Sequence, residues 1–182
     1  DRIIFEEEEE GGHQETSGST EEEMGVCHIA SFLPLTLLMG TGGKESPQVR
    51  MGLPPFDLHT LTGVMGLYLA VEMLNNGDGS VVPQLEGLPD KCPIRFTTEV
   101  FDSSVSTTFT AQQTKQVLQR ETAKGEREAC AFFGASRMTD TGPMAILTGL
   151  EERPQLGPFS TSVQLDNKQT FPFFGRTIVS EV

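Results

Sequence analysis

A chain of 182 residues with 36% hydrophobic residues is long enough to bury one core, and its composition lacks the extremes of a wholly disordered protein. Its formal net charge is −13, but residues 1–24 hold ten acidic groups and one basic group, which leaves 16 acidic against 12 basic residues in the remainder. A folded part of mildly negative charge offers no basic stripe for phosphates, so we expect no nucleic-acid partner.

The first 24 residues combine runs of glutamate with Gly and Ser and contain few apolar side chains. Such a segment cannot bury enough apolar surface to offset the entropy lost on ordering, so residues 1–24 are predicted to be a disordered acidic tail or linker. An acidic interaction arm is the alternative. No apolar run approaches the roughly 20 residues of a membrane-spanning helix. Because the first residue is Asp rather than Met, we expect a piece of a longer protein.

The first half of the remaining sequence alternates between strand and helix patterns. An apolar run with β-branched and aromatic members, Gly25 to Leu35, predicts a strand buried on both faces. Residues 37–57, rich in Gly and Pro, are long for a connection, and such loops are often functional. Helical spacing of apolar residues predicts a helix over 61–76. Residues 92–102 alternate as a second strand.

The second half repeats this alternation. Hydroxyls and a carboxylate at 102–104 can cap a helix that begins near Ser106. Residues 129–134, the run ACAFFG, predict a third strand, and the helix that follows has Asp140 as its expected N-cap, with Pro143 tolerated in the first turn. Residues 155–162 are expected to form a fourth, irregular strand, and an apolar segment around 173–179 a fifth.

Strands that alternate with helices of this length predict an α/β fold, with a doubly wound parallel sheet, helices on both faces and right-handed crossovers. The three cysteines, Cys27, Cys92 and Cys130, are an odd number without metal-ligand spacing, so at most one internal pair can form. Since Cys27 and Cys130 lie on strands expected to be neighbours, either a disulfide or a pair of buried thiols is predicted there.

Small polar residues gather where the predicted strands end, and ligands of open parallel sheets bind at that edge. After the third strand, Gly134 and Ala135 let the backbone approach a ligand, beside the free amides of the next helix. Such a helix start suits a carboxylate or another small anion. Capping of helix and turn is the alternative role for each hydroxyl. The residues of this edge are Ser31, Asp102 to Ser104, Ser136, Thr139, Thr141 and Ser160 to Ser162.

Catalytic patterns are missing from the sequence. There is no Gly-x-Ser-x-Gly elbow, and His13, His28 and His59 fall in the tail, inside the first strand and before the first long helix. His28 is expected to be a core histidine. No Gly-rich phosphate loop appears, so no nucleotide cofactor is predicted, and we expect neither a metal site nor an enzyme.

Three stretches carry a resemblance to a known family: AVEMLNN at 70–76, the segment 131–167 from AFFGASRMTD to VQLDN, and FPFFGRTIVSE at 171–181. Together they resemble the first lobe of the type I periplasmic-binding-protein fold, in the version used by the ligand-binding regions of class C G-protein-coupled receptors and natriuretic-peptide receptors and by bacterial branched-chain amino-acid-binding proteins. In the last stretch the resemblance implies that Phe173, Phe174 and Ile178 pack the lobe and that Arg176 hydrogen-bonds nearby loops.

The resemblance also implies a ligand site. Family members that bind amino acids grip the α-carboxylate at the helix start after the third strand, which here falls beside Ser136 on Arg137, Met138 and Thr139. In the same family members, a residue after the fourth strand contacts the ligand's ammonium group, and the matching positions here are 159–161. The matched residues implied to bind ligand are therefore Ser136, Arg137, Met138, Thr139, Ser160 and Thr161. Met138 stands where a serine is usual, so its backbone amide would serve.

On this resemblance the chain is expected to be the extracellular lobe of a class C-like receptor, nearer the type B γ-aminobutyric acid receptor group. Gly63 falls where glutamate-sensing receptors place a basic side chain, which implies a small amino acid or related anion as ligand. The implied partners are a second lobe, a transmembrane region of the parent protein and another copy in a receptor dimer. Alternatives are a soluble amino-acid-binding protein for transport, a degenerate lobe that binds nothing, a doubly wound enzyme or a truncated product without function of its own.

Overall fold

The computed structural model describes residues 2–3, 25–36, 58–104, 106–120 and 124–181. Its strands are β1 (Arg2–Ile3), β2 (Gly25–Leu33), β3 (Ile94–Asp102), β4 (Ala129–Gly134), β5 (Gln155–Gly157) and β6 (Phe174–Arg176). Its helices are α2 (Leu58–Asn76), α3 (Leu88–Lys91), α4 (Thr107–Leu118) and α5 (Met138–Leu150), with short 3-10 turns at Pro83–Leu85 and Val163–Asp166.

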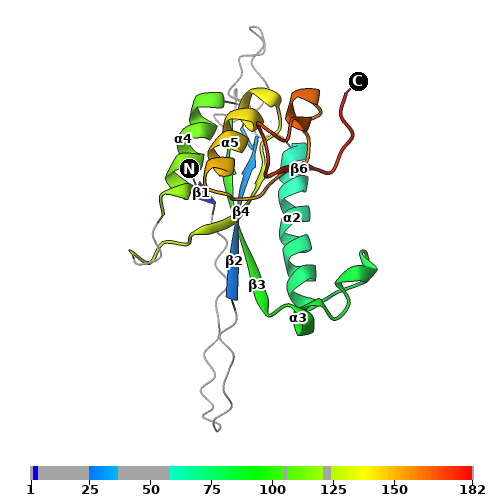
Figure 1. Cartoon of the computed structure of the whole chain (residues 1–182). Coiled ribbons are helices and arrows are strands. Elements are labelled where there is room, and N and C mark those ends of the chain that lie inside the picture. The colour runs from blue at the N-terminus through cyan, green and yellow to red at the C-terminus, as the bar shows by residue number, and fades with distance from the viewer. Residues whose placement is uncertain (1, 4–24, 37–57, 105, 121–123, 182) are drawn as a thin grey trace, which may run out of the picture.

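The strands form one sheet in the order β1-β3-β2-β4-β5-β6, in which β2 to β6 are all parallel (Figure 1). The predicted α/β fold with a parallel sheet is therefore confirmed. The edge strand β1 pairs antiparallel with β3, Arg2 opposite Phe101. These two residues fall within the predicted disordered tail; residues 4–24 and the predicted loop 37–57 lie outside the described residues.

Helices cover both faces of the sheet. Along β2, Ala30 and Phe32 join a core cluster that also takes in α4 and α5, whereas Leu33 joins a second cluster with Val64 of α2. Alternate residues of a strand point to opposite faces, so α4 and α5 share one face and α2 lies on the other, as Figure 1 shows. A third cluster, with Leu165, Phe171 and Phe174, packs the chain after β5 against α5.

The strand order contains one topological switch point. The chain passes from β2 to β3 on one side of the sheet and then crosses to β4 on the other side of β2. In open α/β sheets of this order, ligands bind outside the carboxyl ends of the two strands that flank the switch, here β2 and β4. The segment after β4 leads directly into α5.

Several predicted boundaries shift. The fourth strand was predicted over 155–162, but β5 ends at Gly157, and the fifth ends at Arg176 rather than near 179. The first strand ends at Leu33, and the first long helix begins at Leu58 rather than 61. Pro158 follows β5 directly, and a proline has no N–H to donate to a sheet ladder, which helps to end that strand early.

Candidate ligand site at the start of α5

The turn between β4 and α5 depends on a glycine. Gly134 has φ +106°, and a Cβ at this position would lie 2.0 Å from the backbone oxygen of Phe32 on β2. Only glycine tolerates both the backbone angle and the close approach. The carbonyl of Gly134 accepts a hydrogen bond from Gln155 Nε2 at 2.6 Å, and the Gln155 Oε1 accepts one from Thr148 at 3.2 Å. This turn therefore holds the start of α5 against β2 and β5.

The N-cap of α5 is Arg137, and the helix begins at Met138. The prediction of Asp140 as the N-cap was wrong: Asp140 is the third helical residue, and its Oδ1 accepts the N–H of Arg137 at 3.0 Å. A carboxylate at this third position reaches back to the N-cap amide as the acidic member of a capping box does, so it caps from inside the helix.

Two backbone donors remain at this helix start. The N–H groups of Asp140 and Thr141 donate to the Arg137 carbonyl at 3.1 and 2.7 Å. Among the hydrogen bonds of the described residues, none involves the N–H of Met138 or of Thr139. The first amides of a helix carry partial positive charge and point out of its end, which favours an anion.

The side chains implied to bind ligand differ in exposure. Arg137 and Thr139 are exposed, and Ser136, Met138 and Thr161 are half-buried. Ser160 is 2% exposed, and its hydroxyl bonds that of Thr141 on α5. This contact brings the loop after β5 against the start of α5. It also occupies the Ser160 hydroxyl, so this side chain has a structural partner rather than a free donor.

The segment after β6 fixes the same loop. Arg176 Nη1 donates to the carbonyls of Ser160 and Ser162 at 3.3 and 3.0 Å, and its Nη2 bonds Asp166. The expectation that Arg176 hydrogen-bonds nearby loops is confirmed. Phe174 is buried as expected, whereas Phe173 is 41% exposed, so its predicted role in packing was wrong. Ile178 is half-buried.

The polar residues after β2 and β3 bond one another. Asp102 Oδ1 accepts the N–H groups of Thr36 and Ser104 at 3.1 and 2.9 Å, and Oδ2 accepts both of their hydroxyls. The hydroxyl of Ser31 bonds that of Thr98 at 3.1 Å. These groups act in turn formation and strand pairing. The hydroxyl of Ser103, also in this edge, is buried without a hydrogen-bond partner among the described residues, whereas the start of α5 retains unpartnered backbone donors.

Burial dominates the electrostatics of Asp140. Its side chain is 0% exposed, and desolvation raises the pKa of the carboxyl above its ordinary value. The backbone N–H groups of Asp140, Arg137 and Ser136, and then the guanidinium of Arg137, act in the opposite direction on this pKa without cancelling the effect of burial. Oδ2 has no hydrogen-bond partner in the described structure.

His28 is a core histidine, as predicted. It is 3% exposed, its Nδ1 lies 2.9 Å from Thr97 Oγ1 and its Nε2 lies 3.3 Å from Glu99 Oε2. Arg120 Nη1 donates to the same Glu99 oxygen at 2.7 Å. This buried ion cluster belongs to strands β2 and β3 and to the end of α4, away from the start of α5.

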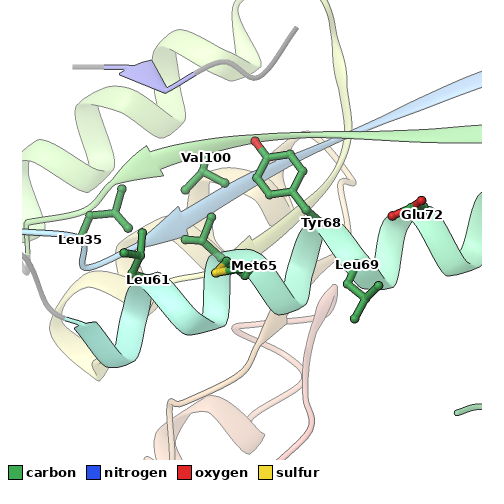
Figure 2. Close-up of a pocket in the computed structure, with 8 residues that line it drawn as sticks. Leu35, Leu61, Met65, Tyr68, Leu69, Glu72 and Val100 are labelled. Carbon is green, nitrogen blue, oxygen red and sulfur yellow. The ribbon is translucent and has the colours of Figure 1, made fainter. Parts of the chain in front are cut away.

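A pocket in the described part of the chain lies away from the predicted site. It has a volume of about 430 Å³ and lies between α2 and the sheet, where Figure 2 shows Leu61, Met65 and Tyr68 of the helix beside Leu35 and Val100. None of the residues implied to bind ligand lines it. Burial, and secondarily the charge of Glu99, raises the pKa of Tyr68. This lining is largely apolar and includes the acidic Glu72, so it suits a carboxylate poorly.

Within the described residues, no group of three or more His, Cys, Asp or Glu is arranged to hold a metal ion, and no helix is long and apolar enough to cross a membrane. No protein-family model matches the chain, and no curated protein matches its sequence.

Proposed function

We propose that this chain is the first lobe of a two-lobed receptor ligand-binding region of the class C type, and that it binds a small amino acid or related carboxylate at the start of α5. The observation that carries the proposal is the pair of unpartnered N–H groups at Met138 and Thr139, which lie directly after β4, one of the two strands flanking the switch point. Arg137 and the hydroxyl of Thr139, both exposed, add a charge and a donor suited to a carboxylate.

The loop after β5 supplies the second part of the site. The hydrogen bond between Ser160 and Thr141 joins this loop to α5, which supports the proposal that the next residue, Thr161, contacts the ligand's ammonium group. In this proposal, lobe one binds the ligand first and a second lobe then closes over it. This closure changes the conformation of a membrane region of the parent protein.

The disulfide between Cys27 and Cys130 supports an extracellular location. Structural disulfides persist in oxidising compartments and are rare in the cytosol. The bond joins the two strands that flank the switch point, β2 and β4.

A pair of substitutions at Met138 tests the site. Met138→Pro removes the backbone N–H at the first helical position, where proline fits a helix, and Arg137 before it is already extended (φ −122°, ψ 157°). Met138→Ala removes the same side chain but keeps the N–H. We expect millimolar glycine, alanine or γ-aminobutyric acid to raise the melting temperature of the wild type and of the alanine variant, and not of the proline variant.

Two results would contradict the proposal. One is a cooperative unfolding transition that no amino acid or small carboxylate moves in the wild type, which would favour a degenerate lobe. The other is equal stabilisation of the proline and alanine variants, which would place the ligand elsewhere on the lobe.

A further inference from the structure

The carboxyl group of Asp140 lies close to the backbone N–H groups that are proposed to hold the ligand's carboxylate. With a ligand bound, the site would therefore contain two acidic groups. Its side chain is fully buried, Oδ1 caps the N–H of Arg137, and Oδ2 has no partner. Two residues of an α-helix differ by about 3 Å along its axis, so this carboxyl lies within one turn of the free N–H of Met138. An ionised Asp140 would repel an anion bound there.

We infer that Asp140 is a proton-linked specificity residue of this site: a carboxylate held by the N–H groups of Met138 and Thr139 binds together with one proton, taken from solvent onto Asp140. The inference rests on the proposed function. Protonation removes the repulsion and gives the unpartnered Oδ2 an O–H to donate. The affinity for carboxylates therefore rises as the pH falls.

Few other charges act on Asp140. The guanidinium of Arg137 is the charged group that lowers its pKa. The helix α4, which packs against α5, carries Lys115 as its single charged residue, and that side chain is exposed. The segment 155–162 contains no charged residue. Desolvation, which raises the pKa of Asp140, is thus opposed by one exposed guanidinium and by backbone amides.

The linkage between proton binding at Asp140 and ligand binding is reciprocal. It can therefore be measured in two ways, as the pH dependence of the ligand affinity and as the change in the pKa of Asp140 on ligand binding. If a proton favours the ligand, the ligand must raise the pKa of Asp140 by the same coupling. For one linked proton, the affinity changes by at most about tenfold per pH unit.

The probe is N-acetylglycine, which has a carboxylate and no ammonium group, titrated into the full chain labelled with ¹⁵N while the amide signals of Met138 and Thr139 are followed. An α-carboxyl titrates near pH 3.5, so the probe keeps its charge between about pH 5.5 and about pH 7.5. We expect its dissociation constant in the wild type to be at least about threefold lower at about pH 5.5 than at about pH 7.5, within the limit for one proton.

Asp140→Asn keeps the oxygen that caps Arg137 and cannot ionise. We expect this variant to bind N-acetylglycine with the same affinity at both pH values, and more tightly than the wild type at the higher one. Asp78→Asn is the matched control, because Asp78 is an exposed carboxylate in the turn after α2 that accepts the N–H of Ser80, and it should keep the wild-type pH dependence.

The outcomes separate this inference from the proposed function. Binding that is independent of pH in the wild type, or a pH dependence that Asp140→Asn retains, overturns the role of Asp140 and leaves the site in place. Absence of binding at both pH values overturns both. A second measurement needs no variant: the Asp140 carboxyl carbon, titrated by ¹³C NMR in the wild type, must show a higher pKa with N-acetylglycine than without it, and an unchanged value refutes the linkage.

Discussion

The disulfide between Cys27 and Cys130 makes a quantitative prediction about stability. The two Cα atoms lie 5.4 Å apart on the paired strands β2 and β4, within the range for an unforced bond, and 103 residues separate them in sequence. Closing a loop of about 100 residues removes chain entropy from the unfolded state worth about 4.7 kcal/mol at 25 °C. Since small domains are stable by only about 5–15 kcal/mol, loss of this bond should remove a large part of the total.

The test replaces both cysteines by serine in the full chain and measures urea unfolding against the wild type. We expect the free energy of unfolding to fall by about 2–5 kcal/mol, and the wild type treated with a thiol reductant to behave like the variant. Cys92→Ser is the matched control, because Cys92 is the free cysteine and its loss should leave the midpoint nearly unchanged. Thiol titration of the unfolded wild type should find one thiol; three thiols, or equal urea midpoints for wild type and double variant, would refute the reasoning.

Four further substitutions give predictions that unfolding measurements test. Gly134→Ala should destabilise the fold by about 2 kcal/mol or more, because the new Cβ meets backbone of β2 and the backbone angle is unfavourable, whereas Gly63→Ala, in open space on α2, should stabilise it by about 0.5–1 kcal/mol; equal effects would contradict the geometry. Arg176→Met should cost about 1–3 kcal/mol through its lost charged hydrogen bonds, and an unchanged melting temperature would argue against that anchoring. Because burial raises the pKa of Asp140, the folded state binds the proton more tightly, so the wild-type free energy of unfolding should fall as pH rises from about 3.9 through the folded pKa, by about 1.4 kcal/mol per unit of increase in pKa. Asp140→Asn should remove this part of the slope, and a slope identical to that of the wild type would contradict it.

The strand and helix pattern of the sheet could be predicted because it depends on local periodicity. Ala30 to Leu33 of β2 are buried on both faces, as parallel strands between two helical layers must be, and β4 contains buried and half-buried residues. The first two residues of β2, Gly25 and Val26, are exposed. The neighbouring positions of Cys27 and Cys130 followed from that sheet, although the sequence left open whether they form a disulfide or remain thiols. Redox state depends on compartment as well as on geometry, so residue spacing alone does not decide it.

The errors arise where distant contacts compete with local signals. Asp140 carries a strong capping preference that fits both the N-cap and the third helical position, and the turn at Gly134, set by its contact with β2, decides between them. Arg2–Ile3 pairs with β3 although a run of glutamates, Glu6 to Glu10, follows closely in sequence, because the edge of β3 offers backbone partners to any extended segment. Phe173 is exposed beside the buried Phe174 because it lies in the turn before β6, which begins at Phe174.

The polar residues at the carboxyl edge of the sheet differ less in residue type than in whether they already have a hydrogen-bond partner within the fold. Ser31, Asp102 and Ser160 looked equivalent to Thr139 in sequence, yet each of the three bonds a group of its own fold, in the first two cases across more than 60 residues. A hydroxyl with an internal partner gains little from a ligand, because binding must first break that bond. Unpartnered backbone N–H groups lose only water to a carboxylate and are already held in place by the helix. The proposed binding of a carboxylate should therefore depend on the amides at the start of α5 far more than on the serines and threonines of this edge.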